Sequence, residues 1–262
     1  MGLIVSNLKY KDFLNEISFK IGKNNIFGIY GTNSKYILDI LNGDILDYSG
    51  VANYDKMDID ELFFKEHPTF VARINTNPNF YSTKVEDEFK FTLEYRRYDG
   101  DVNKAIKNAL KLVELDEKIL TRSIHTLSRS ERYLLGVAVN IAYNPELIIF
   151  DNIFSGIDHK NKKKLITLIN NLKEEKKLII VTSNDVNILY EITDEVLLLD
   201  GNNLYKVGTT DKIFTSNELM KGDIIPMPNI TKVTYLAKTK KNVKLSYHKD
   251  VRDIIKDIYK HV

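Results

Sequence analysis

The sequence predicts an α/β fold built around a mostly parallel central sheet. From residue 128 onward, helical patterns alternate with apolar strand patterns along the chain, which is the order expected of a parallel, doubly wound sheet. Two of the strand patterns contain wholly apolar runs, LIIF at 147–150 and LIIV within KLIIVTS at 177–183, as in strands covered by helices on both faces. With 262 residues and 43% hydrophobic content, the chain can bury a core of ordinary size.

The first third of the chain is predicted to consist of strands, one short helix and a turn-rich stretch. Residues 2–30 contain three strand patterns, the last of which is the buried-type run IFGIY. SKYILDIL at 34–41 has the apolar spacing of a helix and is followed by Asn-Gly, a common helix stop. The next stretch is polar and rich in turn residues, and FVARI at 70–74 is predicted to be a short strand.

Further along, the patterns predict a helix-rich middle and a regular alternation. We expect helices at 84–98 and 101–115, the second with an apolar stripe at 3.6-residue spacing. Helices follow at 128–144, 158–175 and 186–192, with strands at 147–150, 177–183 and 195–200. Ser128 and Asp158 are suitable N-cap residues for the first two of these helices. From about residue 216 the chain becomes basic and ends in an expected helix, which we interpret as a small C-terminal appendage at 216–262.

Composition excludes several classes of function. The chain has no cysteine, which rules out disulfides, thiolate metal sites and cysteine nucleophiles. Its formal net charge of +2 is close to neutral, so no nucleic-acid partner is predicted. No apolar run is long enough to span a bilayer, so we expect any connection with a membrane to be made through a partner.

The strand IFGIY, the segment GTNSKY and the following helix occupy the place where a phosphate-binding loop, G-x-x-x-x-G-K-[ST], would lie. If Gly28 is the first glycine of that pattern, Asn33 replaces the second glycine, Ser34 the lysine and Lys35 the hydroxyl residue. If Gly31 is the first glycine, the loop is about three residues short and Ser34 again replaces the lysine. Both registers damage the phosphate cradle. The candidate phosphate-binding residues are Gly28, Gly31, Thr32, Asn33, Ser34, Lys35 and Tyr36.

A second segment, LSRSERYLLGVAVNIAYNPELIIFDNIFSGID at 127–158, resembles the core of the ATP-binding-cassette (ABC) ATPases. The family pattern runs from the LSGGQ signature through xPELLLLDEP to the SGLD of the D-loop, and it aligns here without a gap. The resemblance implies a P-loop NTPase-like ABC ATPase fold, with a mostly parallel central sheet, an antiparallel β subdomain and a helical subdomain at about 84–144, in a nucleotide-binding domain at 1–215. The residues at family positions are Leu127, Ser128, Arg132, Pro145, Glu146, Asp151, Ser155, Gly156 and Asp158.

The signature itself departs from the family pattern. In the family, this segment donates N–H groups to the γ-phosphate of a nucleotide held by the opposite subunit. Ser128 is retained, but Arg129 and Ser130 replace the two glycines and Glu131 replaces the glutamine. Arg129 is bulky although its charge suits phosphate, whereas Glu131 would bring negative charge toward negative charge. The D-loop residues Ser155, Gly156 and Asp158 are intact.

The residues that the resemblance assigns to catalysis are also altered. Asp151 is retained and would coordinate Mg²⁺. Asn152 replaces the glutamate that polarises the attacking water, and an asparagine cannot act as a base. Asn184 replaces the switch histidine, and Thr76 replaces the glutamine of the Q-loop. Tyr10, at the end of the first strand pattern, is the candidate for stacking on adenine.

Two further segments resemble one branch of this family, the energy-coupling-factor ATPases. They are TNPNFYSTKVEDEFKFTLEY and the tail from VGTTDKIF onward. The branch powers uptake of vitamins or metal ions at the cytoplasmic face of the cell membrane. In it, two ATPases, often non-identical, pair beneath a transmembrane coupling protein. The resemblance therefore implies a second ATPase subunit and a coupling protein as partners, with residues 89–95 lining the groove for the coupling protein and the appendage at 216–262 helping the ATPases to pair.

Three hypotheses about function follow. In the first, the chain is a catalytically impaired ATP-binding subunit of such a transporter and pairs with an active ATPase. In the second, it is a nucleotide-free scaffold with a structural or regulatory role. In the third, it is an active enzyme that uses Lys35 for the lost lysine and Glu131 or Asp185 as base. The cofactors that the resemblance implies are ATP and Mg²⁺. The sequence leaves open whether ATP is bound strongly, weakly or not at all, which substrate is transported, and whether the pair is homo- or heteromeric.

Overall fold

The computed structural model describes residues 2–62, 70–221, 224–241 and 245–261. The described strands form one mixed sheet in the order β5-β4-β1-β2-β10-β9-β3-β8-β7-β6. Strand bounds are β1 Gly2–Tyr10, β2 Leu14–Gly22, β3 Ile26–Tyr30, β4 Ser49–Tyr54, β5 Met57–Asp58, β6 Val71–Asn75, β7 Leu147–Asp151, β8 Leu178–Thr182, β9 Glu195–Asp200 and β10 Asn203–Thr209. Helix bounds are α1 Ser34–Leu41, α2 Ile59–Glu61, α3 Val85–Tyr95, α4 Val102–Leu112, α5 Arg129–Ile141, α6 His159–Glu174, α7 Val186–Ile192, α8 Thr210–Phe214, α9 Asn217–Lys221, α10 Asn229–Lys241 and α11 Val251–His261, with 3₁₀ turns η2 Glu117–Thr121 and η3 Ile124–Thr126.

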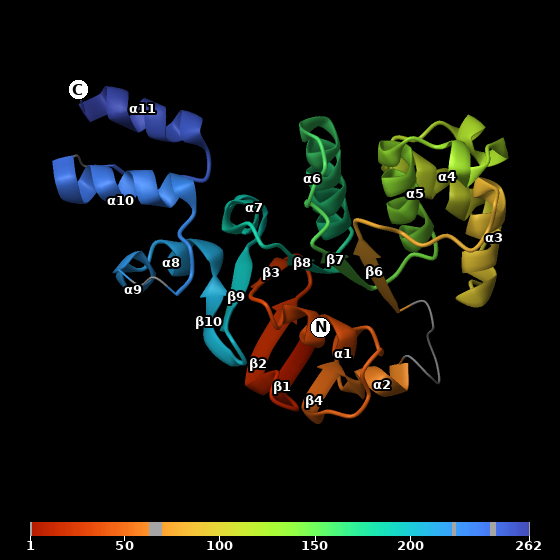
Figure 1. Ribbon diagram of the computed structural model, residues 1–262, viewed down its shortest axis with the longest axis horizontal. Helices are drawn as coiled ribbons and strands as arrows, with labels where there is room; N and C mark the ends of the chain where they lie inside the picture. The colour runs from red at the N-terminus through yellow and green to blue at the C-terminus, as the bar shows by residue number, and fades with distance from the viewer. Residues whose placement is uncertain (1, 63–69, 222–223, 242–244, 262) are drawn as a thin grey trace.

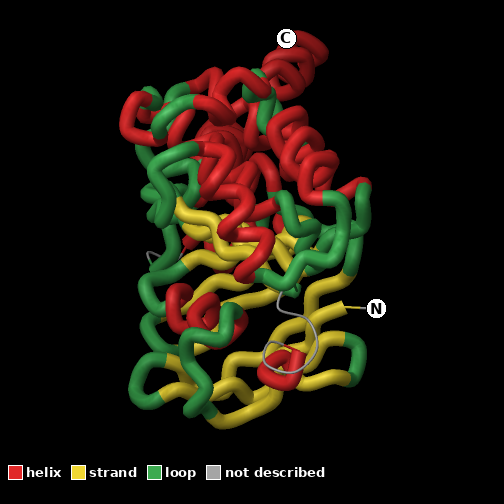
Figure 2. The backbone as a smooth tube through the Cα atoms, turned by 90° about the vertical axis from the view of Figure 1, so that its right-hand side faces the viewer, coloured by secondary structure: helices red, strands yellow, loops and turns green. Residues whose placement is uncertain are grey.

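The sheet combines a parallel half and an antiparallel half. Strands β9, β3, β8, β7 and β6 are parallel neighbours, whereas β2, β1, β4 and β5 pair antiparallel. Strand β10 joins the halves, because it pairs antiparallel with β9 and meets β2 at one parallel pair of residues. Figures 1 and 2 show the helices α3 to α7 on one side of the sheet, away from β1, β2, β4 and α1. The predicted α/β fold with a mostly parallel centre is confirmed.

Two apolar cores cover the two faces of the parallel strands. In β7, Leu147 and Ile149 belong to the core that contains α1 and the antiparallel strands. Ile148 and Phe150 belong to the core formed with α3 to α7. Since successive side chains of a strand point to opposite faces, a strand buried on both sides must be apolar throughout, which explains the runs LIIF and LIIV.

Several predicted elements agree with the structure at their ends. The helices predicted at 34–41 and 186–192 are α1 and α7. Helices α5 and α6 begin after the predicted caps, where the Ser128 side chain accepts from the N–H of Glu131 and that of Asp158 from the N–H of Asn161. The predicted helices at 84–98 and 101–115 are the shorter α3 and α4.

One prediction of irregular structure was wrong, and one strand was not predicted. The stretch after 42, expected to be turns, contains the hairpin β4–β5, and its residues 63–69 lie outside the described part. The stretch after 200 forms β10. Both hairpins turn through residues with positive φ, Asp55 and Lys56 in the first and Gly201 in the second. The Asp-Gly pair at 200–201 is a hairpin signal that the strand patterns alone did not include.

The C-terminal region contains more helix than predicted. Helix α11 lies within the expected terminal helix, but α10 precedes it, and the two helices lie beside each other at the upper left of Figure 1. Lys249 Nζ donates to the carbonyl of Thr193, 3.0 Å away, and so fastens this region to the end of α7. Among the described residues, no helix combines the length and apolarity needed to cross a membrane. The domain boundaries at 215 and 84–144 stay predictions.

Candidate nucleotide-binding and signature site

The turn between β3 and α1 requires glycine. Gly31 has φ +132°, and a Cβ there would lie 2.7 Å from the Cβ of Leu199 on β9. Gly28, by contrast, lies in the middle of β3, where a Cβ would lie 2.9 Å from the Thr193 methyl group. The register that made Gly28 the first glycine of a phosphate loop is therefore wrong. Gly28 is required by close packing, and the loop starts at Gly31.

The N–H groups that would cradle a phosphate are used within the turn itself. The N–H of Ser34 donates to the carbonyl of Gly31, and the N–H of Tyr36 donates to the carbonyl of Asn33, each over 3.1 Å. The Asn33 side chain donates to the carbonyls of Phe13 and Gly201, over 2.9 and 3.1 Å. A phosphate loop binds through successive free N–H groups. In this turn the N–H groups of Ser34 and Tyr36 already have partners, and Asn33 ties the turn to two neighbouring turns.

Three aromatic rings pack beside this turn. Phe13 and Tyr36 stack with centroids 4.2 Å apart, and Tyr10 lies 5.6 Å from Tyr36 and 6.2 Å from Phe13. Lys35 Nζ lies 4.6 Å from the centroid of Tyr36, in the range of a cation–π contact. Tyr10, predicted to stack on adenine, therefore packs on two rings of this chain, and Lys35 is directed to a ring. Thr32 is exposed in the same turn.

The carboxylate of Asp151 is bound to an arginine. Arg73 on β6 donates from Nε and Nη2 to Asp151 Oδ2, over 3.0 and 2.7 Å. Its Nη1 donates to Asp39 Oδ1 on α1, over 2.6 Å, and lies 3.4 Å from Asp44 Oδ2. Burial disfavours the charge of Arg73, but the hydrogen bonds to Asp39 and Asp151 outweigh that effect and raise its pKa. The guanidinium is thus a fixed cation among carboxylates.

Thr182, at the end of β8, donates a hydrogen bond to the other oxygen of the Asp151 carboxylate. Its hydroxyl lies 3.2 Å from Asp151 Oδ1 and accepts from the N–H of Asn152 over 2.9 Å. Asn152 has φ +49°, a left-handed conformation that asparagine adopts more easily than most residues. Asn184 is exposed after β8. Asp185 is the N-cap of α7, where its carboxylate accepts from the N–H of Asn187.

The residues around Asp151 do not fit a Mg²⁺ ion. Magnesium is held by carboxylate and hydroxyl oxygens in near-octahedral geometry, and Lys35, the residue after Ser34 in α1, stands where the family has the hydroxyl residue. Both oxygens of Asp151 already have hydrogen-bond donors, one of them a guanidinium. Over the described ranges, no group of three or more His, Asp or Glu side chains is arranged to hold a metal.

The signature residues form a capping box. The N–H of Ser128 donates to Glu131 Oε2 over 2.8 Å, and the N–H of Glu131 donates to Ser128 Oγ over 3.2 Å. Glu131 Oε1 also accepts from Arg122 over 2.6 Å. The backbone and side chain of Ser128, together with Arg122, hold the pKa of Glu131 below its ordinary value. Glu131 therefore caps α5, and neither Glu131 nor Asp185 is placed as the general base of the third hypothesis.

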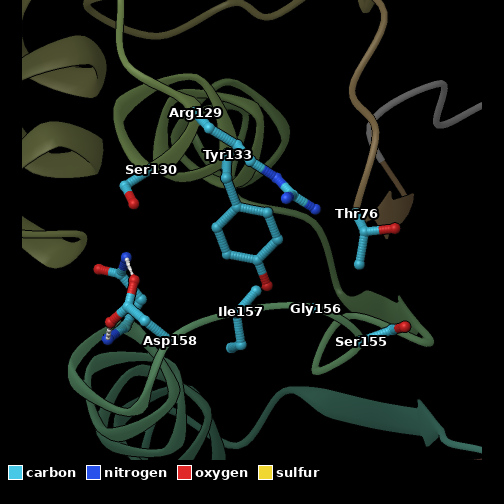
Figure 3. Close-up of a pocket in the computed structure, with 9 residues that line it drawn as sticks. Thr76, Arg129, Ser130, Tyr133, Ser155, Gly156, Ile157 and Asp158 are labelled. Carbon is cyan, nitrogen blue, oxygen red and sulfur yellow. Dashed lines mark hydrogen bonds between the residues drawn. The ribbon is translucent and has the colours of Figure 1, made fainter.

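A pocket of about 240 Å³ lies between the start of α5 and the D-loop. Figure 3 shows Arg129 extending over it between Tyr133 and Thr76, with the D-loop along its lower edge. The Tyr133 hydroxyl donates to the carbonyl of Ile153 over 2.6 Å, which links α5 to the start of the D-loop. The pocket is lined by Thr76, Arg129, Ser130, Tyr133, Ser155, Gly156, Ile157, Asp158 and Asn161.

Pro78, which follows the Q-loop position Thr76, packs on Gly136 of α5. A Cβ at Gly136 would lie 2.5 Å from Pro78 Cβ, so glycine permits this close approach. The signature, the D-loop and the Q-loop segment thus line one pocket, whereas the turn at 31–33 and Asp151 are engaged with protein groups.

Sequence reasoning missed three participants. Arg73 interrupts the apolar strand FVARI, and a charge in a buried strand is the signal that could have identified it. Phe13 carries no local signal, because its stacking partner is twenty-three residues away. The capping box is present in the sequence as S-x-x-E at 128–131. Because of the family resemblance, Glu131 was instead interpreted as a residue that faces phosphate.

Comparison with known proteins agrees with this geometry. The ABC transporter family profile matches residues 14–155. The chain belongs to the ABC transporter family. Its relatives include the energy-coupling factor transporter ATP-binding proteins EcfA2 of Mycoplasmoides gallisepticum, 29% identical over 84% of this chain and 74% of the relative, and EcfA of Malacoplasma penetrans, 27% identical over 90% and 85%.

A solved structure of an ABC protein shares the fold. CbiO1 of Clostridium perfringens, described as part of the ABC transporter complex CbiONQ, superposes with a TM-score of 0.70 over 89% of this chain and 98% of that one, at 19% identity. In this fold the carboxyl ends of the parallel strands β3, β7 and β8 lie at the same edge of the sheet. Asp151 ends β7 there, Asn152 follows it, and Asn184 comes two residues after β8.

Proposed function

We propose that this chain is a catalytically impaired ATPase subunit of an energy-coupling-factor-like transporter, held at the cytoplasmic face of the membrane by a transmembrane coupling protein and paired with a second, active ATPase subunit. The relatives named EcfA support the branch. The observation that carries the impairment is the engagement of Asp151 by Arg73. Uptake of a vitamin or a metal ion is the transport reaction that the branch implies.

The impairment rests on groups with different chemical roles. Asn152 supplies no base, and the N–H groups of Ser34 and Tyr36 are used within their own turn. In phosphoryl transfer, positioning and electrostatic stabilisation provide almost all of the catalysis. Because both the cradle and the metal ligand are engaged, turnover at this chain's own nucleotide site is not expected.

In the proposed pair, the signature segment and the D-loop of this chain face the nucleotide bound by the second subunit. ABC sites form between subunits, so the partner's nucleotide would meet this chain's Ser128, Arg129 and the D-loop. Arg129 and Arg132 have no carboxylate partner within 4.0 Å among the described residues, and they lie in the first turns of α5. Their guanidinium groups are therefore available to a phosphate. We propose that the site with turnover is the one formed by the partner's phosphate loop and this signature.

ATP turnover by the isolated chain is the first test. We expect the wild-type protein to hydrolyse ATP no faster than its Asp151→Ala and Asp151→Asn variants, with circular dichroism as the check on folding. Turnover that is lost in both folded variants would refute the impairment.

Reconstitution tests the pairing. The chain, a second ATPase of the EcfA type with an intact catalytic glutamate and a coupling protein should assemble and hydrolyse ATP, and replacing the partner's catalytic glutamate by glutamine should abolish turnover. An assembly that retains half of its turnover after that replacement would contradict the proposal.

A nucleotide-free scaffold is the second candidate, and the stacking of Tyr10, Phe13 and Tyr36 on one another favours it. Calorimetry with Mg-ATP separates the two candidates. Binding in the micromolar range would exclude the scaffold, whereas absence of binding to the isolated, folded chain would favour it.

A further inference from the structure

Arg73 carries a positive charge in a largely buried part of the sheet. It is the third residue of β6, and its neighbours Val71, Ala72 and Ile74 are buried apolar residues. By strand alternation, it points to the same face as Val71, the face covered by α1. Its side chain is only 18% exposed, and a charge at this depth persists only when it is paired.

Its partners come from separate elements. Asp151 ends β7 and Asp39 lies on α1, and the two salt bridges measure 2.7 and 2.6 Å. Side-chain exposures of 26% and 25% for these carboxylates place both of them at the edge of the interior. One guanidinium thus joins three elements, and its planar fork suits two carboxylates at once.

We infer that the Arg73 guanidinium takes the place of a divalent cation in this chain, so that Asp39, Arg73 and Asp151 fasten α1, β6 and β7 together without metal. The inference deepens the proposed function, on which it rests for the role of the site. A divalent ion at Asp151 would have to displace two N–H donors from Oδ2 and would be repelled by the guanidinium. The site is therefore closed to Mg²⁺ whether or not nucleotide is present.

Mn²⁺ binding, followed by electron paramagnetic resonance, tests this directly. We expect no stoichiometric binding of Mn²⁺ to the wild-type chain in the millimolar range. Arg73→Gln leaves Asp39 and Asp151 facing the space that the guanidinium filled, so we expect Mn²⁺ to bind this variant at least about tenfold more tightly. Adding Asp151→Asn to Arg73→Gln should remove that gain.

Thermal unfolding provides the second measurement. Arg73→Gln should lower the melting temperature by about 5 °C or more, and Mg²⁺ should restore part of the loss, whereas the wild-type melting temperature should not respond to Mg²⁺. Lys173→Gln is the matched control, because Lys173 forms a partly buried pair with Asp194 on other elements at 2.8 Å. It should lower the melting temperature without creating a response to Mg²⁺ or Mn²⁺.

Mn²⁺ binding to the wild-type chain that Asp151→Asn abolishes would overturn the inference, as would a folded Arg73→Gln variant that gains no Mn²⁺ binding. Should Arg73→Gln fail to fold, the wild-type titration decides alone. These measurements use no ATP turnover. Wild-type Mn²⁺ binding without turnover would therefore refute the cation replacement only, and turnover by the isolated chain would refute the proposed function.

Discussion

Removal of the Glu131 side chain tests whether this residue caps α5. Glu131→Ala loses the bond from the Ser128 N–H, 2.8 Å long, and the pair with Arg122, 2.6 Å long. A capping bond contributes about 1 kcal/mol. The Arg122 pair adds at most about 0.5 kcal/mol, because its side chains are 40% and 32% exposed. The variant should therefore lose about 1–1.5 kcal/mol in urea unfolding, or about 3 °C in melting temperature.

Glu131→Gln is the matched control. A glutamine can accept the same bond from the Ser128 N–H, so only the charge toward Arg122 is lost and the change should stay within about 0.5 kcal/mol. If the glutamine variant is destabilised as much as the alanine variant, the ion pair and not the cap is the source of the stability. If neither variant changes the free energy of unfolding, the capping argument is refuted.

The pH dependence of the same comparison has a defined sign. The folded-state pKa of Glu131 is lowered, chiefly by the backbone and side chain of Ser128. The stability that its charge contributes is therefore fully present above the unfolded-state pKa and is lost as pH falls through the lower folded-state pKa. The difference in free energy of unfolding between wild type and Glu131→Gln should shrink between about pH 5 and pH 3. A difference that grows as pH falls would contradict the assignment.

Three further substitutions test the packing of the site. Gly136→Ala places a Cβ 2.5 Å from that of Pro78 and should cost about 1–3 kcal/mol, measured by thermal unfolding. Tyr133→Phe removes the 2.6 Å bond to the D-loop carbonyl and should cost about 1–2 kcal/mol in urea unfolding, with an unchanged circular dichroism spectrum. Gly31→Ala, at φ +132°, should cost about 1–3 kcal/mol, whereas Gly22→Ala, with open space around it, should not carry that steric cost. Equal melting temperatures for the two alanine variants would show that the turn is not strained.

The elements of the parallel half were predictable because their signals are local. Runs such as LIIF must be strands buried on both faces, and Ser128 and Asp158 cap the helices that follow them. The hairpin β9–β10 was missed because β10 mixes exposed and half-buried side chains, so its pattern resembles a loop. Its Asp-Gly turn was the remaining local signal.

The sequence showed which positions of the candidate site depart from the family pattern, but not which side chains pack there in the folded chain. The changes at Ser34, Asn152 and Asn184 are visible as departures from a pattern, since each one removes a functional group at a known place. What fills the site depends on residues brought together from distant parts of the chain. Phe13 meets Tyr36 only because the β1–β2 turn and α1 come together, with Asn33 bonded to the backbone of that turn.

The sequence by itself determined the family, the parallel core and the departures from the family's catalytic pattern, because these depend on residue type and spacing along the chain. Only the tertiary structure decided that Arg73 binds Asp151 and Asp39, which lie 78 and 34 residues away. A strand pattern records that an arginine interrupts an apolar run, but its partners are set by strand order and by the helix that covers that face. The charge that occupies the expected metal position is therefore a property of the fold.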